Sequence, residues 1–377
     1  MEHAKNIYVA PLSPWVIGPK RQPLMRGRAS VSNISGRFEA LKREPVQDGW
    51  LREEDKPSIN TVVTEEPAKH IITKNTSPDI PFDRSINAYR GCEHGCVYCF
   101  ARPTHAYLGL SPGLDFETKL FAKSNAAELL EKEISAKNYI PQPIAMGTNT
   151  DPYQPIEKER RITRQLLKVL LKYEHPVTIL TKSRLVVRDL DLIAPMAEKG
   201  LIKVGLSVTS LDRKLSRLME PRASTPQRRL DAIKLLSDAG VPTSVMFAPL
   251  IPALNDHELE AVLSAAAHAG ATHAGYILLR LPQEVAGLFS EWLEAHYPDR
   301  KKRVLNRLSA LRGGKLNDPR FKHRMKGNGF EADLMRQRFK NLCRRLKLNA
   351  EQIDLDTSQF KKPVLEGGQY DLLDALK

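Results

Sequence analysis

The chain has few of the features that mark membrane or disulfide-stabilised proteins. Its 377 residues contain no run near the ~20 apolar residues of a membrane span. Only four cysteines are present, and three of them fall within eight positions, which makes a poor disulfide framework. The N-terminus has an early acid, prolines and an interrupted apolar stretch, unlike a secretory signal. We therefore expect a cytoplasmic protein.

Acidic residues are scarce in one region. Between Asp299 and Lys347 the sequence has 17 Lys or Arg but only 4 Asp or Glu, whereas the whole chain has a net charge of +14. Nearly all of the positive excess therefore lies near the C-terminus. Such a concentration is typical of proteins that bind nucleic acid or another polyanion, and a solvated basic helical face is the alternative.

Three regions differ in their sequence pattern. Residues 1–75 are rich in Pro, Arg and Ser without a sustained period, which predicts a partly irregular N-terminal arm. Residues 76–298 alternate β-rich runs with helical patterns, and six such units indicate parallel strands with crossover helices. The expected fold is an α/β sheet or an open TIM-like barrel. Residues 299–377 predict a basic, mostly helical extension that packs on this barrel.

The expected elements of the core have recognisable ends. Thr225 before Pro226 is a typical helix start, and Gly200, Gly240 and Gly270 fall where helices should stop. The predicted strands are 85–91, 143–149, 176–182, 201–209, 242–250 and 273–279, and the predicted helices are 124–136, 160–173, 187–199, 225–239, 256–268 and 284–296.

Three cysteines follow the first expected strand, in the sequence GCEHGCVYCFAR. Cys92, Cys96 and Cys99 have C-x3-C-x2-C spacing, and loops at the C-terminal ends of barrel strands carry function. Three thiolates at this spacing can hold three corners of a [4Fe–4S] cluster and leave one iron open to a small molecule. A zinc ion bound by the same cysteines with His94 or His105 is the alternative.

This loop resembles a known signature. GCEHGCVYC matches the CxxxCxxC pattern of the radical S-adenosylmethionine (radical SAM) superfamily, including an aromatic residue, Tyr98, before the third cysteine. The segments NAYRGCEHGCVYCFAR, GTNTDPYQPIE and MEPRASTPQRRLDAIKLLSDAG resemble a bacterial radical SAM group related to spore photoproduct lyase, often labelled DNA-repair-photolyase-like. The resemblance covers about residues 80–295 and implies a partial (β/α)6 barrel.

The resemblance also implies a reaction. Cys92, Cys96 and Cys99 would be the metal-binding and catalytic residues, holding a [4Fe–4S] cluster whose open iron binds S-adenosylmethionine. One-electron reduction then cleaves S-adenosylmethionine to methionine and a 5′-deoxyadenosyl radical, which abstracts a hydrogen atom. The implied protein is a radical enzyme of lyase or oxidoreductase type, with an electron donor such as flavodoxin or ferredoxin as its partner and no membrane partner.

Candidate cofactor contacts follow from the same resemblance, because radical SAM barrels hold the methionine and ribose groups at the ends of the second to fifth strands. Many members have Gly-Gly-Glu after the second strand, where this chain has MGTNTDPYQ. Asn149 and Asp151 are then the candidates for the ammonium group, and Lys182 and Ser183 for the carboxylate and the ribose. A turn-forming Asp151 and a surface Lys182 are the alternatives.

Two further strand ends supply candidates. Arg222 is the preferred contact for the cofactor carboxylate, since arginine recognises carboxylates with two parallel hydrogen bonds. A salt bridge to Glu220 or Asp231 is the alternative. Ser207 ends the fourth strand, facing the same expected site.

The substrate is less well defined by the sequence. Tyr107, Tyr153 and Tyr276 fall near strand ends, where they could stack on a base or pass a hydrogen atom, and ordinary packing is the alternative. Spore photoproduct lyase uses an additional cysteine as hydrogen donor, whereas only Cys343 is spare here. The basic extension favours a nucleic-acid substrate. The alternatives are a nucleic-acid-binding protein with a structural cluster or zinc site, and a radical enzyme acting on a protein or small metabolite.

Overall fold

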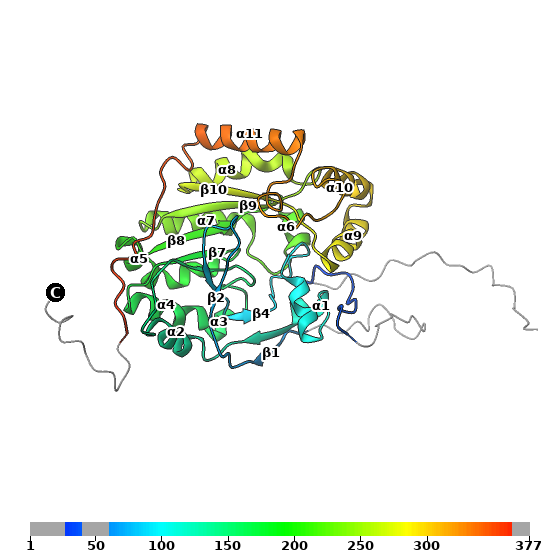
Figure 1. Cartoon of the computed structure of the whole chain (residues 1–377). Coiled ribbons are helices and arrows are strands. Elements are labelled where there is room, and N and C mark those ends of the chain that lie inside the picture. Colours follow the sequence, from blue (N-terminus) through cyan, green and yellow to red (C-terminus); the bar gives the residue numbers. More distant parts are fainter. Residues whose placement is uncertain (1–26, 40–59, 364–377) are drawn as a thin grey trace, which may run out of the picture.

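The computed structural model describes residues 27–39 and 60–363, and its centre is a seven-stranded sheet (Figure 1). All neighbouring strands pair in parallel except the edge strand β2, which is antiparallel to β3. The six parallel strands confirm the expected α/β fold, a partial (β/α)6 barrel. In order across the sheet, the strands are β10 (His273–Leu278), β9 (Thr243–Leu250), β8 (Ile202–Ser207), β7 (Val177–Thr181), β6 (Ile144–Met146), β3 (Arg84–Ile86) and β2 (Ile72–Lys74).

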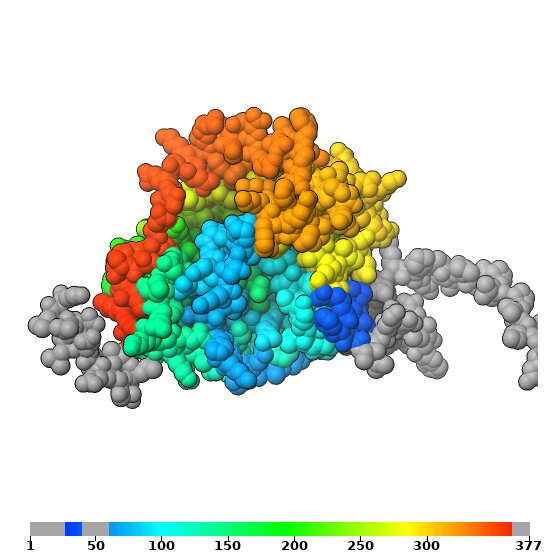
Figure 2. All heavy atoms as spheres, viewed as in Figure 1, coloured from blue at the N-terminus to red at the C-terminus, as the bar shows by residue number. Residues whose placement is uncertain are grey.

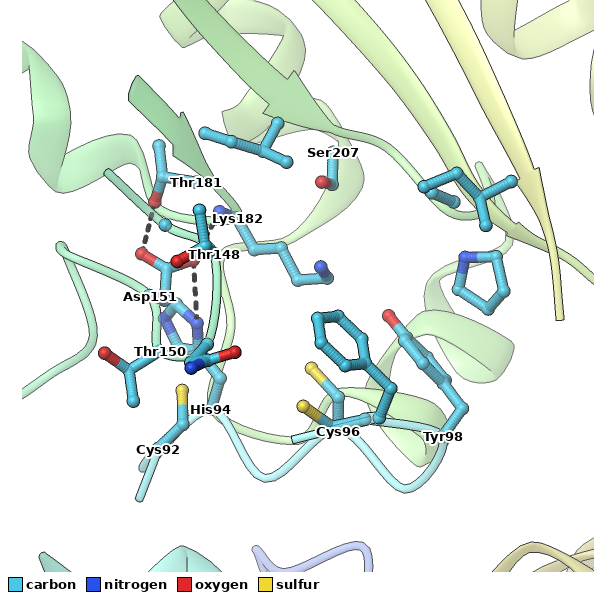
Figure 3. Close-up of a pocket in the computed structure, with 18 of the residues that line it drawn as sticks. Cys92, His94, Cys96, Tyr98, Thr148, Thr150, Asp151, Thr181, Lys182 and Ser207 are labelled. Atoms are coloured by element: carbon cyan, nitrogen blue, oxygen red, sulfur yellow. Dashed lines mark hydrogen bonds and ion pairs between the residues drawn. The ribbon is translucent and has the colours of Figure 1, made fainter. Parts of the chain in front are cut away.

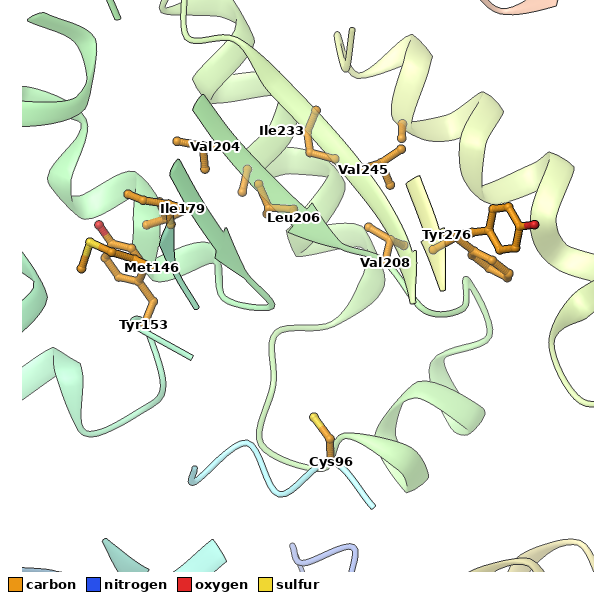
Figure 4. Packing of buried hydrophobic residues seen from close by; sticks show 14 of the residues in the cluster. Cys96, Met146, Tyr153, Ile179, Val204, Leu206, Val208, Ile233, Val245 and Tyr276 are labelled. Atoms are coloured by element: carbon orange, nitrogen blue, oxygen red, sulfur yellow. The ribbon is translucent and has the colours of Figure 1, made fainter. Parts of the chain in front are cut away.

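Amphipathic helices cover the outer face of the sheet. In α4, for example, Ile162, Leu166 and Leu170 form a buried stripe with one residue per turn. Figure 4 shows the same packing between the sheet residues Leu206 and Val245 and Ile233 on a covering helix. The connecting helices are α2 (Ala126–Ile134), α4 (Ile162–Lys172), α5 (Leu190–Glu198), α7 (Pro226–Asp238), α8 (Leu259–His268) and α9 (Glu284–His296).

Shorter helical segments complete the loops of the barrel. They are η2 (Arg102–Leu108), α1 (Leu114–Thr118), α3 (Glu157–Arg160), η3 (Arg184–Asp189), α6 (Arg213–Met219) and η4 (Asp256–Glu258). None of the helices in the described part of the chain is both long and apolar enough to cross a membrane.

A second, three-stranded sheet lies beside the barrel. Its strands are β1 (Val62–Glu65), β5 (Lys119–Ala122) and β4 (Tyr89–Arg90), in that order. The sequence pattern did not predict β1 or β5, because each is four residues long and pairs with a partner distant in sequence. Part of the expected arm is therefore ordered sheet.

Residues 27–39 of the expected arm also pack on the core. The backbone N–H groups of Ala29 and Ser30 donate to the Glu117 carboxylate at 3.2 and 3.0 Å, and Arg28 Nη1 donates to the Glu117 carbonyl at 2.8 Å. The rest of the predicted arm, residues 1–26 and 40–59, lies outside the described residues.

The basic C-terminal region closes the open side of the barrel. It contains α10 (Pro298–Ala310) and α11 (Phe330–Arg345), joined by a loop over 311–329. Within that loop Met325 accepts a hydrogen bond from the Leu278 N–H at 2.9 Å, and Arg324 pairs with Asp79 of the β2–β3 loop at 2.6 Å. In Figure 2 the orange loop meets the light-blue β2–β3 region. The C-terminal region thus packs on the barrel, as predicted, and its loop contacts both edges of the sheet, at β10 and at the β2–β3 loop.

Candidate functional site

The three clustered cysteines line one pocket at the C-terminal ends of the parallel strands. We call this cavity of about 160 Å³ the cysteine pocket. Cys92 and Cys96 are buried, and Cys99 is half-buried. Figure 3 shows the sulfur atoms of Cys92 and Cys96 pointing from their loop toward Lys182 and the strand ends. The loop and the barrel therefore face each other across this cavity.

A buried arginine fixes the shape of the cysteine loop. The Arg102 side chain is fully buried and donates hydrogen bonds to the carbonyls of Gly95 and Cys96 at 3.0 and 2.9 Å. Its charge is balanced by Glu117 at 2.5 Å. Gly95 has φ of +66°, and a Cβ there would lie 2.7 Å from Glu117 Oε2. Sequence reasoning missed the role of Arg102, although an arginine three residues after the last cysteine was a visible signal.

The cysteine thiols are poorly solvated. Burial raises the pKa of the Cys96 thiol to about 12 and raises the pKa of the Cys92 thiol well above its ordinary value. Without a bound cation these groups stay protonated at neutral pH, whereas thiolates are the form that ligates metals. Among the residues that the structure describes, no three His, Cys, Asp or Glu side chains converge on a point where one metal ion could sit. The fit to a cluster therefore rests on three thiols that face one cavity.

Asp151 ties the strand ends to the cysteine loop. Its carboxylate accepts hydrogen bonds from Thr181 Oγ1 at 2.6 Å and from the Lys182 N–H at 2.8 Å. Nδ1 of the buried His94 lies 3.3 Å from Asp151 Oδ2. Burial raises the pKa of Asp151, but His94 and these hydrogen bonds outweigh it and bring the pKa to about 2. Asp151 is thus an ionised anchor between β6, β7 and the loop.

Tyr98 belongs to a second buried network. Its hydroxyl donates to Glu220, which also accepts from Thr209 Oγ1 at 2.5 Å and pairs with the buried Arg229. Arg229 Nη1 in turn donates to the Ser207 carbonyl at 2.8 Å. This network holds the wall of the pocket opposite Asp151, and sequence reasoning did not identify its Glu220–Arg229 pair.

Like Arg280, Lys182 is a cation that lines the cysteine pocket. Its Nζ lies 5.9 Å from the centroid of the Tyr98 ring and forms no hydrogen bond or ion pair within the described part of the chain. Burial lowers the pKa of Lys182, but the neighbouring Cys96 and Glu220 outweigh this effect and raise it. A charged ammonium group is therefore available to a bound anion.

The structure separates the predicted cofactor contacts into two groups. Tyr98, Asn149, Asp151, Lys182 and Ser207 line the cysteine pocket together with the three cysteines. Their roles toward a cofactor stay predictions.

Ser183 and Arg222 are not among the residues that line the cysteine pocket. Ser183 Oγ accepts from the Leu185 N–H at 3.2 Å and caps η3. Arg222 is 39% exposed and forms a salt bridge with Glu93 at 2.8 Å. A salt bridge was the alternative considered from the sequence, but with Glu220 or Asp231 as the partner. This placement does not support Arg222 as the carboxylate contact.

Of the three tyrosines and the additional metal ligands considered from the sequence, only His94 lines the cysteine pocket within the described part of the chain. Tyr107 is exposed, Tyr153 is fully buried, and Tyr276 packs on Phe339 with ring centroids 4.9 Å apart. Of the two histidines, His94 lines the cysteine pocket, whereas His105 Nε2 lies 2.9 Å from the Lys119 carbonyl oxygen. Cys343 is buried on α11.

Comparison with known proteins identifies the family. Residues 86–266 match the model of the radical SAM superfamily. The chain belongs to this superfamily. The family membership predicted from the cysteine signature is thereby confirmed.

Its curated relatives extend across bacteria and archaea. The chain is 40% identical over 222 residues to the uncharacterized protein Rv2578c of Mycobacterium tuberculosis, an alignment that covers 58% of this chain and 65% of that relative. It is 30% identical over 228 residues to the uncharacterized protein MJ0683 of Methanocaldococcus jannaschii, covering 60% of this chain and 81% of the relative. The match thus spans a little less than two thirds of the mycobacterial protein's length.

Solved structures show the same fold. Spore photoproduct lyase complexed with dinucleoside spore photoproduct superposes with a TM-score of 0.53 at 16% identity, covering 75% of this radical SAM chain and 79% of that one. A double mutant of spore photoproduct lyase with bound AdoMet and the same ligand gives a TM-score of 0.52 at 15% identity, with equal coverage. At these identities the likeness establishes the barrel architecture. Superfamily membership in turn implies S-adenosylmethionine and an iron–sulfur cluster as cofactors.

Proposed function

We propose that this protein is a radical SAM enzyme that holds a [4Fe–4S] cluster on Cys92, Cys96 and Cys99 and acts on a nucleic-acid substrate. The observation that carries the proposal is the convergence of the three signature cysteines and the unpaired Lys182 on one pocket at the strand ends. When bound, the cluster supplies the electron that cleaves S-adenosylmethionine and so starts hydrogen abstraction.

The residues around the pocket have distinct tasks in this proposal. Lys182 attracts the carboxylate of S-adenosylmethionine, because its half-buried ammonium forms no hydrogen bond or ion pair among the described residues. Asn149 and Ser207 offer an amide and a hydroxyl group to the polar groups of the same ligand. Asp151 already accepts three hydrogen bonds, from Thr181 and from the N–H groups of Lys182 and Tyr153, so it positions the loop and is the weaker candidate for the ammonium group.

The basic C-terminal region supports a nucleic-acid partner. Fewer of its cations are free to bind phosphate than its composition suggests. Among the described residues between Asp299 and Lys347, six cations form ion pairs with acidic side chains. On α10, however, Arg300, Lys302 and Arg303 are exposed and have no acidic partner within the described residues. A row of exposed cations along one helix attracts a phosphate backbone.

The cluster itself is the first part of the proposal to test. Anaerobic purification and reconstitution should give a brown protein with about four irons and four sulfides per chain, as a [4Fe–4S] cluster requires. Cys99→Ala should lower the iron content, whereas Cys343→Ala, which changes the cysteine on α11, should not. A colourless protein that takes up zinc but no iron would contradict the proposal.

A further inference from the structure

A second cavity lies inside the barrel and opens to the cysteine pocket. We call this cavity, of about 700 Å³, the barrel chamber. It shares Phe100, Thr148, Asn149 and Arg280 with the lining of the cysteine pocket. Cavities of about 300–1,000 Å³ are the usual size of small-molecule sites. The chamber therefore has room for a ligand that reaches the site of radical formation.

The chamber exists because the inner face of the sheet carries small residues. Ala145, Gly205 and Ser244 line it from β6, β8 and β9, where closed barrels usually place bulky branched side chains. A Cβ at Gly205 would lie 2.8 Å from Ser244 Oγ, so a larger residue would narrow the cavity. The hollow is thus a property of the sequence of the inner face.

The lining of the chamber is positively charged. Its cations are Lys74, Lys203, Arg280 and Arg324, and its one acid among the described lining residues is Asp79. The Asp79 carboxylate is already engaged by Arg324 at 2.6 and 2.8 Å. The remaining charge favours an anionic ligand.

Arg280 differs from the other arginines near the chamber. Arg324 binds Asp79, and Arg312 donates to the carbonyls of Leu278 and Leu279 at 3.0 and 2.6 Å. Arg280 forms no hydrogen bond or ion pair within the described part of the chain.

The Arg280 guanidinium instead lies over an aromatic ring. Its Cζ is 4.3 Å from the ring centroid of Phe100, the residue directly after the third cysteine. Arg280 is half-buried, and burial and the nearby Arg324 lower its pKa. A guanidinium has five N–H donors in a fixed plane and is suited to an oxyanion. Phe100 holds this plane at the border between the chamber and the cysteine pocket.

We infer that Arg280 binds an oxyanion of the substrate, a phosphate or a carboxylate, while the remainder of the substrate occupies the barrel chamber. The inference rests on the proposed function for the chemistry that follows binding. Binding itself depends only on the chamber and its charge. Lys182, which lines the cysteine pocket but not the barrel chamber, remains the group for the carboxylate of S-adenosylmethionine.

The test compares charged and neutral probes of matched shape. Thymidine 5′-monophosphate with thymidine tests a phosphate, and indole-3-acetate with 3-methylindole tests a carboxylate. Isothermal titration calorimetry uses the full chain, purified anaerobically, without a reductant, so that cofactor cleavage plays no part. At least one anionic probe should bind about tenfold tighter than its neutral partner, since hydrogen bonds to charged groups contribute about that much.

Three variants locate the binding site. Arg280→Gln should abolish the preference for the anionic probe, and Arg228→Gln, at an exposed arginine on α7, should leave it unchanged. Ser244→Leu should weaken binding of both members of the pair by filling the chamber, with thermal melting as the check on folding. The fold is thus monitored separately from the affinity.

Two kinds of result would overturn the inference about Arg280. Equal affinity for both members of both pairs, or an unchanged preference in Arg280→Gln, would overturn the inference. Weaker binding of S-adenosylmethionine to Arg280→Gln in equilibrium dialysis, with probe affinities unaltered, would assign Arg280 to the cofactor and also overturn it. Loss of cofactor cleavage with intact probe binding would count against the proposed function alone.

Discussion

Individual buried charges determine the shape of the cysteine pocket. Arg102 is paired with Glu117 beneath the loop, and Arg229 is paired with Glu220 behind Tyr98. Each pair also donates hydrogen bonds to backbone carbonyls near the site. Desolvation of such pairs is costly, so they are poor sources of net stability, but removing one partner leaves a charge buried and uncompensated.

Arg102→Leu should lower the free energy of unfolding of the cluster-free protein by about 3–5 kcal/mol, because Glu117 would remain buried without its partner. Arg160→Leu is the matched control, since it breaks an exposed pair with Glu65 that contributes less than about 1 kcal/mol. Urea denaturation measures both values. Similar small losses in the two variants would contradict a structural role for Arg102.

Lys182→Met should weaken binding of S-adenosylmethionine about tenfold or more, because the variant keeps the volume of the side chain but removes its unpaired charge. The iron content should not change, since Lys182 is not a cluster ligand. Arg222→Met should have little effect, because Arg222 pairs with Glu93 outside the pocket. Equilibrium dialysis with the reconstituted protein measures the affinity of both variants for S-adenosylmethionine. A larger loss of affinity in Arg222→Met than in Lys182→Met would favour Arg222 as the carboxylate contact, as predicted from the sequence.

At the scale of elements, the barrel was predictable because its signals are local. Each core strand is a short β-rich run, and helices such as α4 have an apolar stripe. Three of the helices, α5, α7 and α8, end just before Gly200, Gly240 and Gly270, which have positive φ. The strands β1 and β5 were not predictable, because their pairing joins segments more than fifty residues apart. Residue pairs such as Tyr98 with Glu220 depend on the same long-range folding. The sequence therefore identified the three cysteines of the pocket but not the buried charges that hold their loop in place.

The junction between α4 and β7 gives a prediction about pH. His175 is buried there between Tyr139 and Phe360, and burial lowers its pKa to about 4. In the unfolded chain its pKa is about 6.5, so unfolding takes up a proton between these values. Stability should be complete above pH ~6.5 and fall as the pH drops toward 4.

His175→Gln should remove this contribution and flatten the dependence by up to about 1.4 kcal/mol per pH unit. Urea denaturation of the cluster-free protein between pH 7 and 4.5 provides the measurement. The control is His268→Gln, which changes an exposed histidine at the end of α8. Parallel curves for His175→Gln and the parent protein would contradict the assignment.

At the scale of the whole molecule, the C-terminal region both closes the barrel and carries the exposed cations. Met325 and Arg312 bond to the end of β10, and Arg324 bonds to the β2–β3 loop. Deletion of residues 299–347 would therefore open the barrel as well as remove charge. Point substitutions on α10 separate these two effects.

Replacing Arg300, Lys302 and Arg303 together with Gln should weaken binding to duplex DNA and make it less sensitive to salt. Each lost phosphate contact should reduce the slope of log K against log salt concentration by about 0.9. Fluorescence anisotropy at several salt concentrations measures the slope. A triple variant of the exposed Lys158, Arg213 and Arg228, on other helices, is the control of equal charge. Equal slopes for the two variants would argue against α10 as the nucleic-acid surface.

We propose above that S-adenosylmethionine is cleaved to a radical in the cysteine pocket. The most direct test of this claim is the release of 5′-deoxyadenosine from S-adenosylmethionine by the anaerobic, reconstituted and chemically reduced protein, measured by liquid chromatography. We expect the parent protein and Cys343→Ala to release 5′-deoxyadenosine, and Cys99→Ala to release none above background. Cluster-loaded parent protein that binds S-adenosylmethionine and, once reduced, leaves it intact would contradict the account.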